Sequence, residues 1–314
     1  MLEVPVYLIT GFLESGKTTF IDEVLSSQDF ADGERTILLV CEEGEVEYDA
    51  KELSRHNIEI VTVENEEDLT VSFLEQCHKK YKPRRVFVEF NGLWDPKRFV
   101  EELLPRRWQV VQVIMLVDGS TFEVYLNNMR GILGNMFALT ELVIFTRCNP
   151  EMPLQKYRRA VKAVNPAAML SFEDDEGEQI ELGKEQPPYD LNAEVIEIDD
   201  VDFGLWFLDM TDNPDRYDGK TVRFIGKVMT NRRLGDNVFV PGRNAMTCCA
   251  DDIRFIGYVC KSSHVKELTP KQWLEVTAEV KYEYSPAYGE EGPILYAKHL
   301  KSVEAPKDEL VYFN

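Results

Sequence analysis

A glycine-framed loop close to the first residue constrains the fold of this chain more than any other feature. A short apolar run, Val4–Ile9, precedes the loop, and a helical pattern from Lys17 to Leu25 follows it. The loop matches G-x-x-x-x-G-K-[ST] in full, and its fixed residues are Gly11, Gly16, Lys17 and Thr18. A buried strand, this loop and a helix in succession predict a phosphate-binding loop in an α/β domain.

The chemistry of a polyphosphate explains why these residue types are needed. Glycines let successive backbone N–H groups turn inward around the phosphates, and the new helix points its positive dipole end at the same charge. Lys17 can reach the β- and γ-phosphates, and Thr18 can offer its hydroxyl to Mg²⁺. The predicted nucleotide-binding residues of the loop are Gly11, Glu14, Ser15, Gly16, Lys17, Thr18 and Thr19.

An acidic loop follows the second predicted strand, Arg35–Cys41, and begins at Glu42. Ligands of open α/β sheets lie beyond the carboxyl ends of the strands, so these acids are expected on the side of the phosphates. Without a metal they would repel a triphosphate. We therefore interpret Glu42 and Asp49 as Mg²⁺ ligands, and Glu45 as a residue that positions the attacking water. A solvated acidic turn is the alternative.

Glu89 ends a further hydrophobic strand, Arg85–Glu89, after a strand at Ile58–Val63 and a helix at Glu67–Tyr81. A carboxylate at the end of such a strand is where P-loop proteins hold or orient the Mg²⁺ shell. Glu89 is therefore a candidate for metal binding and, with Glu45, for positioning water. Gly92 can bring a backbone N–H to the γ-phosphate.

Strands and helices continue to alternate over the first half of the sequence. We predict strands at Val110–Val117 and Glu141–Thr146, and a helix at Glu151–Val164. This alternation is typical of a mainly parallel sheet with helices on both faces, and we place this domain at residues 1–172.

Three motifs in order carry a family resemblance over about residues 1–170. They are Gly11–Thr19, Glu42-x-Gly44-Glu45 with Asp49, and Glu89-x-x-Gly92-x-x-x-Pro96. Together they resemble the G3E family of P-loop GTPases, most closely the CobW-like branch that includes zinc metallochaperones. The resemblance implies GTP hydrolysis with Mg²⁺, coupled to the handling of a metal or cofactor.

Two stretches depart from that family's pattern. CobW-like proteins carry Cys-x-Cys-Cys after the third strand, whereas Val63–Asp68 contains no cysteine. The guanine-reading Asn-Lys-x-Asp is replaced by Thr146-Arg147-Cys148-Asn149. Asn149 keeps one acceptor for the base but loses the charge, and Arg147 can lie along the base. GTP is expected rather than ATP, with a non-hydrolysing scaffold or an ATP-using module as alternatives.

The second half of the sequence has a different pattern. Residues 173–192 form a predicted acidic linker, in a region (173–202) with thirteen acidic residues and one lysine. From 193 to 314 we expect a separate small all-β domain, an OB-like barrel, with one short helix at Phe203–Met210. Its predicted strands are Thr221–Met229, Asn237–Val240, Ile253–Cys260, Trp273–Tyr284 and Ile294–Val303. Gly226 and Gly257 are expected at bulges or close approaches.

Adjacent cysteines mark this second domain. Cys248 and Cys249, with Cys260 downstream, offer soft ligands suited to Zn²⁺ or another soft metal. The alternative is one core and one surface thiol, because neighbouring strand residues point to opposite faces. The stretch Arg-x-x-x-x-Cys-Cys-x-x-Asp from Arg243 resembles the soluble C-terminal domain of bacterial two-subunit permeases. That resemblance implies a transport context.

Composition limits the partners. The net charge of −21 argues against nucleic acid, whose phosphates require a basic face. No apolar run approaches the length of a membrane span, and the sequence enters its first strand without a secretory signal. We therefore expect a cytoplasmic protein that does not itself span the membrane, with a nucleotide and either a metal cargo or a membrane transporter subunit as partners.

Overall fold

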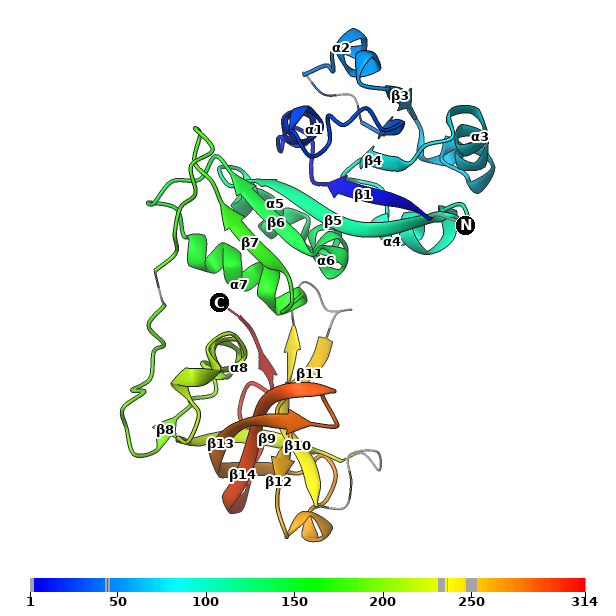
Figure 1. Cartoon of the computed structure of the whole chain (residues 1–314). Coiled ribbons are helices and arrows are strands. Elements are labelled where there is room, and N and C mark those ends of the chain that lie inside the picture. The colour runs from blue at the N-terminus through cyan, green and yellow to red at the C-terminus, as the bar shows by residue number, and fades with distance from the viewer. Residues whose placement is uncertain are drawn as a thin grey trace. The chain divides into compact units, whose positions relative to one another are not determined.

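The computed structural model describes residues 3–42, 44, 46–183, 185–230, 235, 237–246 and 253–313. Its contacts divide the chain into two compact units, Met1–Leu182 and Gly183–Asn314 (Figure 1). The first unit therefore extends past residue 172, where the sequence placed its end. The extension is held by a bridge between Glu173 and Gln179, and by Ile180 and Leu182, which pack against the core of the first unit.

A seven-stranded parallel sheet forms the centre of the described part of the first unit, as expected. In sheet order the strands are β3 (Ile58–Thr62), β2 (Thr36–Val40), β4 (Arg85–Glu89), β1 (Val4–Thr10), β5 (Trp108–Asp118), β6 (Leu142–Thr146) and β7 (Met169–Phe172). The strands β2 and β4 are buried at every residue, as strands covered on both faces must be. Because all strands are parallel, the loops after β1, β2, β4, β5 and β6 share one edge.

Helices cover both faces of this sheet. The helices α1 (Lys17–Ser26) and α2 (Ala50–Arg55) pack on one face through a cluster that includes Ile21 and Leu53. The other face is covered by α3 (Val71–Tyr81), α4 (Pro96–Arg98) with the π-helical turn Phe99–Leu103, α5 (Phe122–Asn128), α6 (Arg130–Leu139) and α7 (Leu154–Val164). Among the described residues, no helix combines the length and apolar character needed to cross a membrane.

Some elements differ from the sequence expectation for local reasons. The helix expected from Glu67 begins at Val71, because the Thr70 side chain accepts a hydrogen bond from the N–H of Phe73 and caps it there. Residues 66–68 form a 3₁₀ turn instead. The sequence did not indicate α5, α6 or β7. Met136 of α6 is buried in the core on the face of the sheet that this helix covers.

The second unit is mostly β. Its elements are β8 (Ile196–Glu197), α8 (Phe203–Asp212), β9 (Thr221–Met229), β10 (Val238–Met246), β11 (Ile253–Gly257), β12 (Cys260–Lys261), β13 (Trp273–Ser285), β14 (Glu290–Val303) and β15 (Leu310–Val311), with 3₁₀ turns at Pro214–Arg216 and Val265–Glu267. The expected strand Ile253–Cys260 is divided, because Tyr258 and Val259 leave the ladder between β11 and β12.

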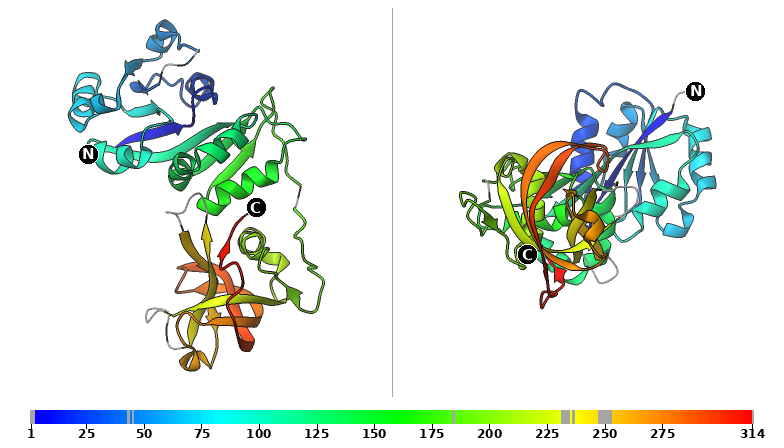
Figure 2. Two further views of the ribbon diagram at one scale, coloured as in Figure 1. Left: turned by 180° about the vertical axis from the view of Figure 1, so that it is seen from behind. Right: turned by 90° about the horizontal axis from the view of Figure 1, so that it is seen from below.

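Five of these strands close on one another. β9 pairs with β10, β10 with β12, β12 with β14, β14 with β13, and β13 again with β9. The pair β12–β14 is parallel and the other four are antiparallel. Figure 2 shows these strands, coloured yellow to red, curving around one another. The expected separate, mostly β domain is confirmed, and these five strands close into a small barrel, whose OB type stays a prediction.

Three glycines lie where β9, β10 and β11 pass close together. A Cβ at Gly226 would lie 3.0 Å from the backbone nitrogen of Gly242, and one at Gly257 would lie 2.7 Å from the carbonyl oxygen of Pro241. The first distance is tighter than most Cβ contacts and the second is prohibitive. The expected close approaches at Gly226 and Gly257 are therefore confirmed, and Gly242 is a third position of the same kind.

Candidate nucleotide site

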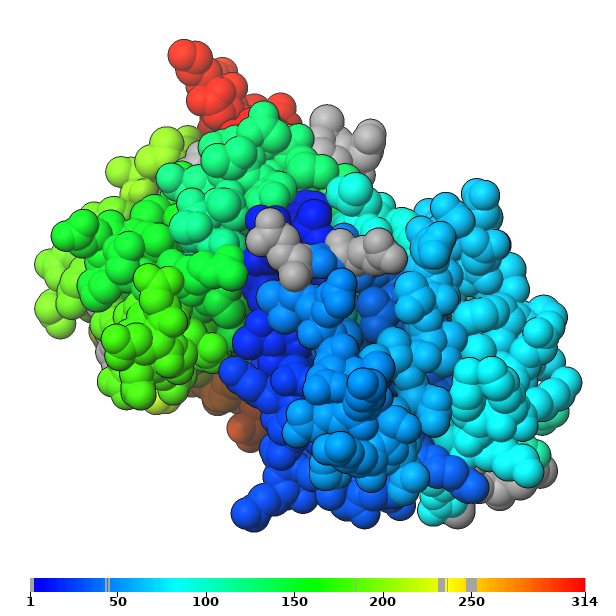
Figure 3. All heavy atoms as spheres, turned by 90° about the horizontal axis from the view of Figure 1, so that it is seen from above, coloured from blue at the N-terminus to red at the C-terminus, as the bar shows by residue number. Residues whose placement is uncertain are grey.

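The phosphate-binding loop runs from the end of β1 into α1, at the carboxyl edge of the sheet. Gly11 and Gly16 have φ values of 137° and 95°, which side chains rarely adopt, and a Cβ at Gly11 would collide with the carbonyl oxygen of Leu116. Glu14 has a φ of 63°. In the space-filling view, the dark-blue atoms of the first residues lie between lighter-blue and green segments of the same unit (Figure 3).

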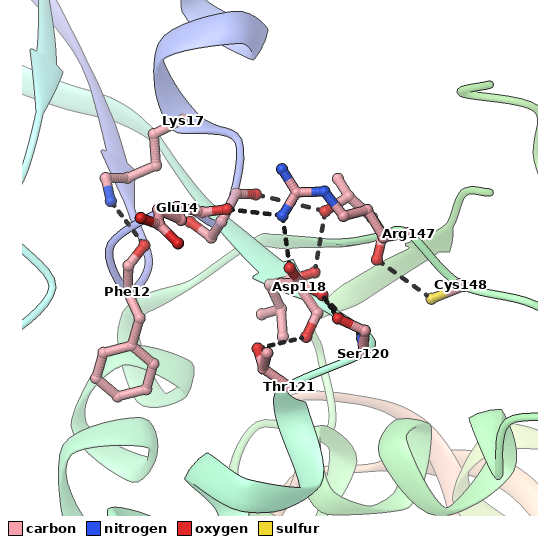
Figure 4. Close-up of polar contacts among 11 residues, drawn as sticks. Phe12, Glu14, Lys17, Asp118, Ser120, Thr121, Arg147 and Cys148 are labelled. Carbon is pink, nitrogen blue, oxygen red and sulfur yellow. Dashed lines mark hydrogen bonds and ion pairs between the residues drawn. The ribbon is translucent and has the colours of Figure 1, made fainter. Parts of the chain in front are cut away.

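Lys17 is buried, with a side chain 3% exposed. Its Nζ donates to the carbonyl oxygens of Gly11 and Phe12, both at 2.9 Å, and to Glu42 Oε2 at 2.6 Å. Figure 4 shows the lysine reaching back across the loop to Phe12. The structure thus brings Glu42 to the lysine. The interpretation of Glu42 as a Mg²⁺ ligand beside Thr18 has no support in its contacts, because its carboxylate neutralises the buried ammonium.

Thr18 and Glu89 lie together, as the sequence predicted for a Mg²⁺ site. Thr18 Oγ1 donates to Glu89 Oε1 at 2.7 Å, and the Tyr48 hydroxyl donates to Glu89 Oε2 at 2.7 Å. Burial raises the pKa of Tyr48, and the nearby Glu89 carboxylate raises it further. Sequence reasoning missed Tyr48. The only signal for it was its place inside the acidic loop.

Asp49 has a structural role in these contacts. Its Oδ1 accepts from the backbone N–H groups of Lys51 and Glu52, at 2.9 and 3.1 Å, and so caps α2. Asp49 nevertheless lines a cavity of about 400 Å³ beside the loop, whose walls are Thr18, Thr19, Asp22, Leu25, Ser26, Ala31, Val46, Glu47, Tyr48, Asp49, Glu52, Leu53 and His56. Glu45 lies outside the described residues.

Gly92 packs against the phosphate-binding loop. A Cβ at this position would collide with the carbonyl oxygen of Gly11 and would lie 2.9 Å from Phe12 Cα. The loop after β4 therefore touches the backbone of the loop after β1. This contact agrees with the predicted position of Gly92 near the phosphates.

The stretch Thr146-Arg147-Cys148-Asn149 follows β6 and contacts the same loop. Thr146 Oγ1 lies 3.4 Å from the carbonyl oxygen of Ser15. Arg147 Nη1 donates to the carbonyl oxygen of Glu14 at 2.9 Å and to Asp118 Oδ2 at 2.5 Å. Asn149 Oδ1 accepts from the N–H of Glu151 at 3.0 Å, so a local turn uses the acceptor that was expected to read the base.

Two family models match consecutive parts of the chain. Residues 5–171 match the nucleotide-binding domain of CobW/HypB/UreG, which is more than half of the sequence. The chain belongs to the CobW/HypB/UreG family. Residues 174–313 match the DUF1980 C-terminal domain.

Known proteins are similar to part of this chain. The protein named zinc chaperone YjiA, from Escherichia coli (strain K12), is 24% identical over 184 residues, which are 54% of this chain and 57% of YjiA. The chain thus spans just over half the length of that curated relative. The crystal structure of Zn(II)-bound YjiA GTPase from E. coli has a TM-score of 0.42 and 24% identity over 54% of this chain and 57% of its own. The crystal structure of hydrogenase maturation factor HypB from Archaeoglobus fulgidus has a TM-score of 0.42 and 14% identity, over 56% of this chain and 84% of its own.

The donors at the centre of the CobW-type domain suit magnesium. Mg²⁺ prefers oxygen ligands and is commonly bound by one or two carboxylates together with substrate phosphates. A threonine hydroxyl and the Glu89 carboxylate, 2.7 Å apart at the start of the helix, fit that preference.

The soft-metal prediction finds little support among the described residues. Cys260 is fully buried in β12, and burial raises the pKa of its thiol, which disfavours the thiolate that a metal needs. No group of three His, Cys, Asp or Glu side chains in the described ranges could hold a metal ion. Cys248 and Cys249 lie outside those ranges. Cys260 is therefore a core residue of the barrel.

Proposed function

We propose that this protein is a Mg²⁺-dependent GTP-binding protein that hydrolyses GTP and couples its nucleotide state to the delivery of a metal or cofactor. The observation that carries the proposal is the contact of Thr18 with Glu89, next to the buried Lys17, within a CobW-type domain. Magnesium and γ-phosphate need these groups side by side.

Each residue of the site has a role in this proposal. The loop from Gly11 to Thr19 would surround the phosphates with backbone N–H groups, and Lys17 would offset the charge of the β- and γ-phosphates. Thr18 and Glu89 would hold Mg²⁺, which when bound neutralises the charge that develops on the phosphates. Glu89 or Glu45 would orient the attacking water.

The cargo is proposed to be a metal ion such as Zn²⁺. YjiA, whose curated name is zinc chaperone, supports this proposal. Residues 63–68 lack the cysteines of the usual site. We therefore propose that Cys248 and Cys249 of the second domain bind the cargo or a partner. We further propose that this domain is an OB-type barrel that contacts a membrane transporter subunit, and that the protein works in the cytoplasm.

The test of the nucleotide site is Lys17→Ala. This variant should retain its fold by circular dichroism and lose binding of GTP, because the ammonium that offsets the phosphate charge is gone. Isothermal titration of wild type and variant with GTP and ATP measures the effect. Equal affinities would exclude the proposed site.

A second function is favoured by one observation. Asn149 Oδ1 is used by Glu151, and no carboxylate stands in its place, so the base end of the site lacks the group that selects guanine. The protein could then be a scaffold that binds GTP or ATP without hydrolysis. Steady-state phosphate release with each nucleotide, in Mg²⁺ with and without Zn²⁺, separates the two. Release with GTP supports the GTPase, and no release under any condition supports the scaffold.

A further inference from the structure

One arginine connects three segments around the phosphate-binding loop. Arg147, after β6, donates through Nη1 to Asp118 at the end of β5 and to the carbonyl oxygen of Glu14 in the loop after β1. In Figure 4 the guanidinium lies between these two acceptors, and Lys17 lies on the other side of the loop. A residue expected to lie along a base thus has its charge directed at the phosphate loop.

The acceptor Asp118 is fixed in place. Its Oδ1 accepts from both the backbone N–H and the hydroxyl of Ser120, at 2.8 and 2.5 Å, while Oδ2 accepts from Arg147. The Asp118 side chain is 14% exposed and that of Arg147 47%. A partly buried carboxylate with both oxygens occupied is a stable anchor for the guanidinium, because charge-assisted hydrogen bonds are among the stronger ones.

Both residues joined by the backbone contact have unusual conformations. Glu14 has a φ of 63° and Arg147 a φ of 52°, in the left-handed region that non-glycine residues rarely adopt. Residues in this conformation persist only where their surroundings hold them. Glu14 directly precedes Ser15 and Gly16 in the phosphate-binding loop, so its conformation sets the direction of that part of the loop.

We propose that Arg147, oriented by Asp118, is a positioning residue that holds the phosphate-binding loop in its binding conformation and does not read the base. This inference rests on the proposed nucleotide site. It predicts that Arg147 contributes equally to the binding of any ligand that fills the phosphate loop, whatever base the ligand carries.

A ligand without a base tests this directly. Wild type and Arg147→Ala are titrated calorimetrically with GTP, ATP and inorganic tripolyphosphate in Mg²⁺. Loss of a hydrogen bond that involves a charged group should lower the affinity for all three ligands by a similar factor, about tenfold. Arg147→Lys should restore part of the loss for all three. Arg106→Ala removes an exposed arginine at the other end of β5 and should leave each affinity unchanged.

The outcomes are distinct. If Arg147→Ala weakens GTP but leaves tripolyphosphate unchanged, the residue reads the base and the proposal is wrong. If Arg147→Ala does not fold, Asp118→Asn replaces it, since it removes only the charge that orients the arginine. That variant should bind each of the three ligands about threefold more weakly than wild type does. Unchanged affinity for tripolyphosphate would contradict the proposal. Failure of wild type to bind any of the three ligands would instead contradict the nucleotide site itself.

Discussion

At the scale of single residues, the ion pair between Lys17 and Glu42 is the contact that a nucleotide would have to change. The lysine is 3% exposed and the glutamate side chain 11%, so neither charge is left to water. A phosphate that binds Lys17 must compete with a carboxylate already 2.6 Å from it. The acidic loop after β2 is therefore connected to the phosphate-binding loop through this lysine.

We expect Glu42→Gln to bind GTP more tightly than wild type, by about threefold to tenfold. A neutral amide competes less strongly than a carboxylate for the Lys17 ammonium. The GTP-bound state is therefore stabilised relative to the nucleotide-free state. Titration calorimetry at constant Mg²⁺ measures the change, and Glu59→Gln, on the exposed side of β3, is the matched control. Weaker binding in Glu42→Gln would favour the earlier interpretation of Glu42 as a metal ligand.

The pair of Asp118 and Arg147 should make stability depend on pH. Burial alone would raise the pKa of Asp118, but hydrogen bonds from Ser120 and Arg147 outweigh it, so the pKa is lowered from 3.8. A carboxyl with a lowered folded pKa stabilises the fold above its unfolded pKa and loses that contribution as the pH falls. Asp118→Asn should therefore reduce the unfolding free energy at pH 7, and the difference from wild type should shrink below about pH 4.

Urea unfolding of both proteins between pH 3 and pH 7 measures this difference. If the difference in unfolding free energy between the two proteins stays constant from pH 3 to pH 7, Asp118 acts through its shape and not its charge. Ser120→Ala, which removes one donor to the same carboxylate, should give a smaller effect with the same pH dependence.

The sequence predicted the central residues of the site because their spacing is fixed by the backbone. Lys17 and Thr18 follow the loop directly, and Glu89 ends a strand adjacent to β1, so the strand order alone brings Thr18 and Glu89 together. Tyr48 and the partner of Arg147 were not predictable in this way. Their contacts depend on how loops from different strands fold over the edge of the sheet. Periodicity in the sequence does not predict such contacts between loops.

At the scale of elements, burial determined which strands could be predicted. Residues 85–89 and 221–229 were predicted with their observed bounds, because the first is apolar in its interior and the second alternates between buried and half-buried residues. The helices α5 and α6 were missed. They are short and joined at Met129, so neither has the length over which a helical period becomes clear.

Gly92→Ala tests the contact between two loops of the site. Its methyl group would collide with the Gly11 carbonyl and push the phosphate-binding loop out of position. We expect at least a tenfold loss of GTP affinity, with a loss of about 1–3 kcal/mol in unfolding free energy from overpacking. Gly131→Ala is the control, because a Cβ there meets nothing within 4 Å. Unchanged affinity in Gly92→Ala would show that the loops move independently.

At the scale of the whole molecule, the division after Leu182 can be tested with two fragments. A fragment ending at Leu182 keeps Ile180 and Leu182, which pack against the core of the first unit, whereas one ending at Phe172 loses both. Burying such side chains stabilises a fold by about 1–3 kcal/mol each. The longer fragment should bind GTP as the full chain does, and the shorter one should melt several degrees lower.

Differential scanning calorimetry and GTP titration of both fragments make this comparison. Equal melting temperatures would place the end of the first domain at residue 172, as the composition of the acidic stretch suggested. The composition of residues 173–202 led to that prediction, because thirteen acidic residues there outnumber the few apolar ones.

The crossing of Gly226, Gly242 and Gly257 affects the dynamics of the barrel. The backbones of β9, β10 and β11 approach one another closely at these glycines, and β10 also pairs with β12 and β15. Opening β10 would thus require several ladders to separate in one event. The amide hydrogens of Val240 and Gly242 should exchange with solvent only when the whole domain unfolds, while those of the two-residue strand β8 exchange through local opening.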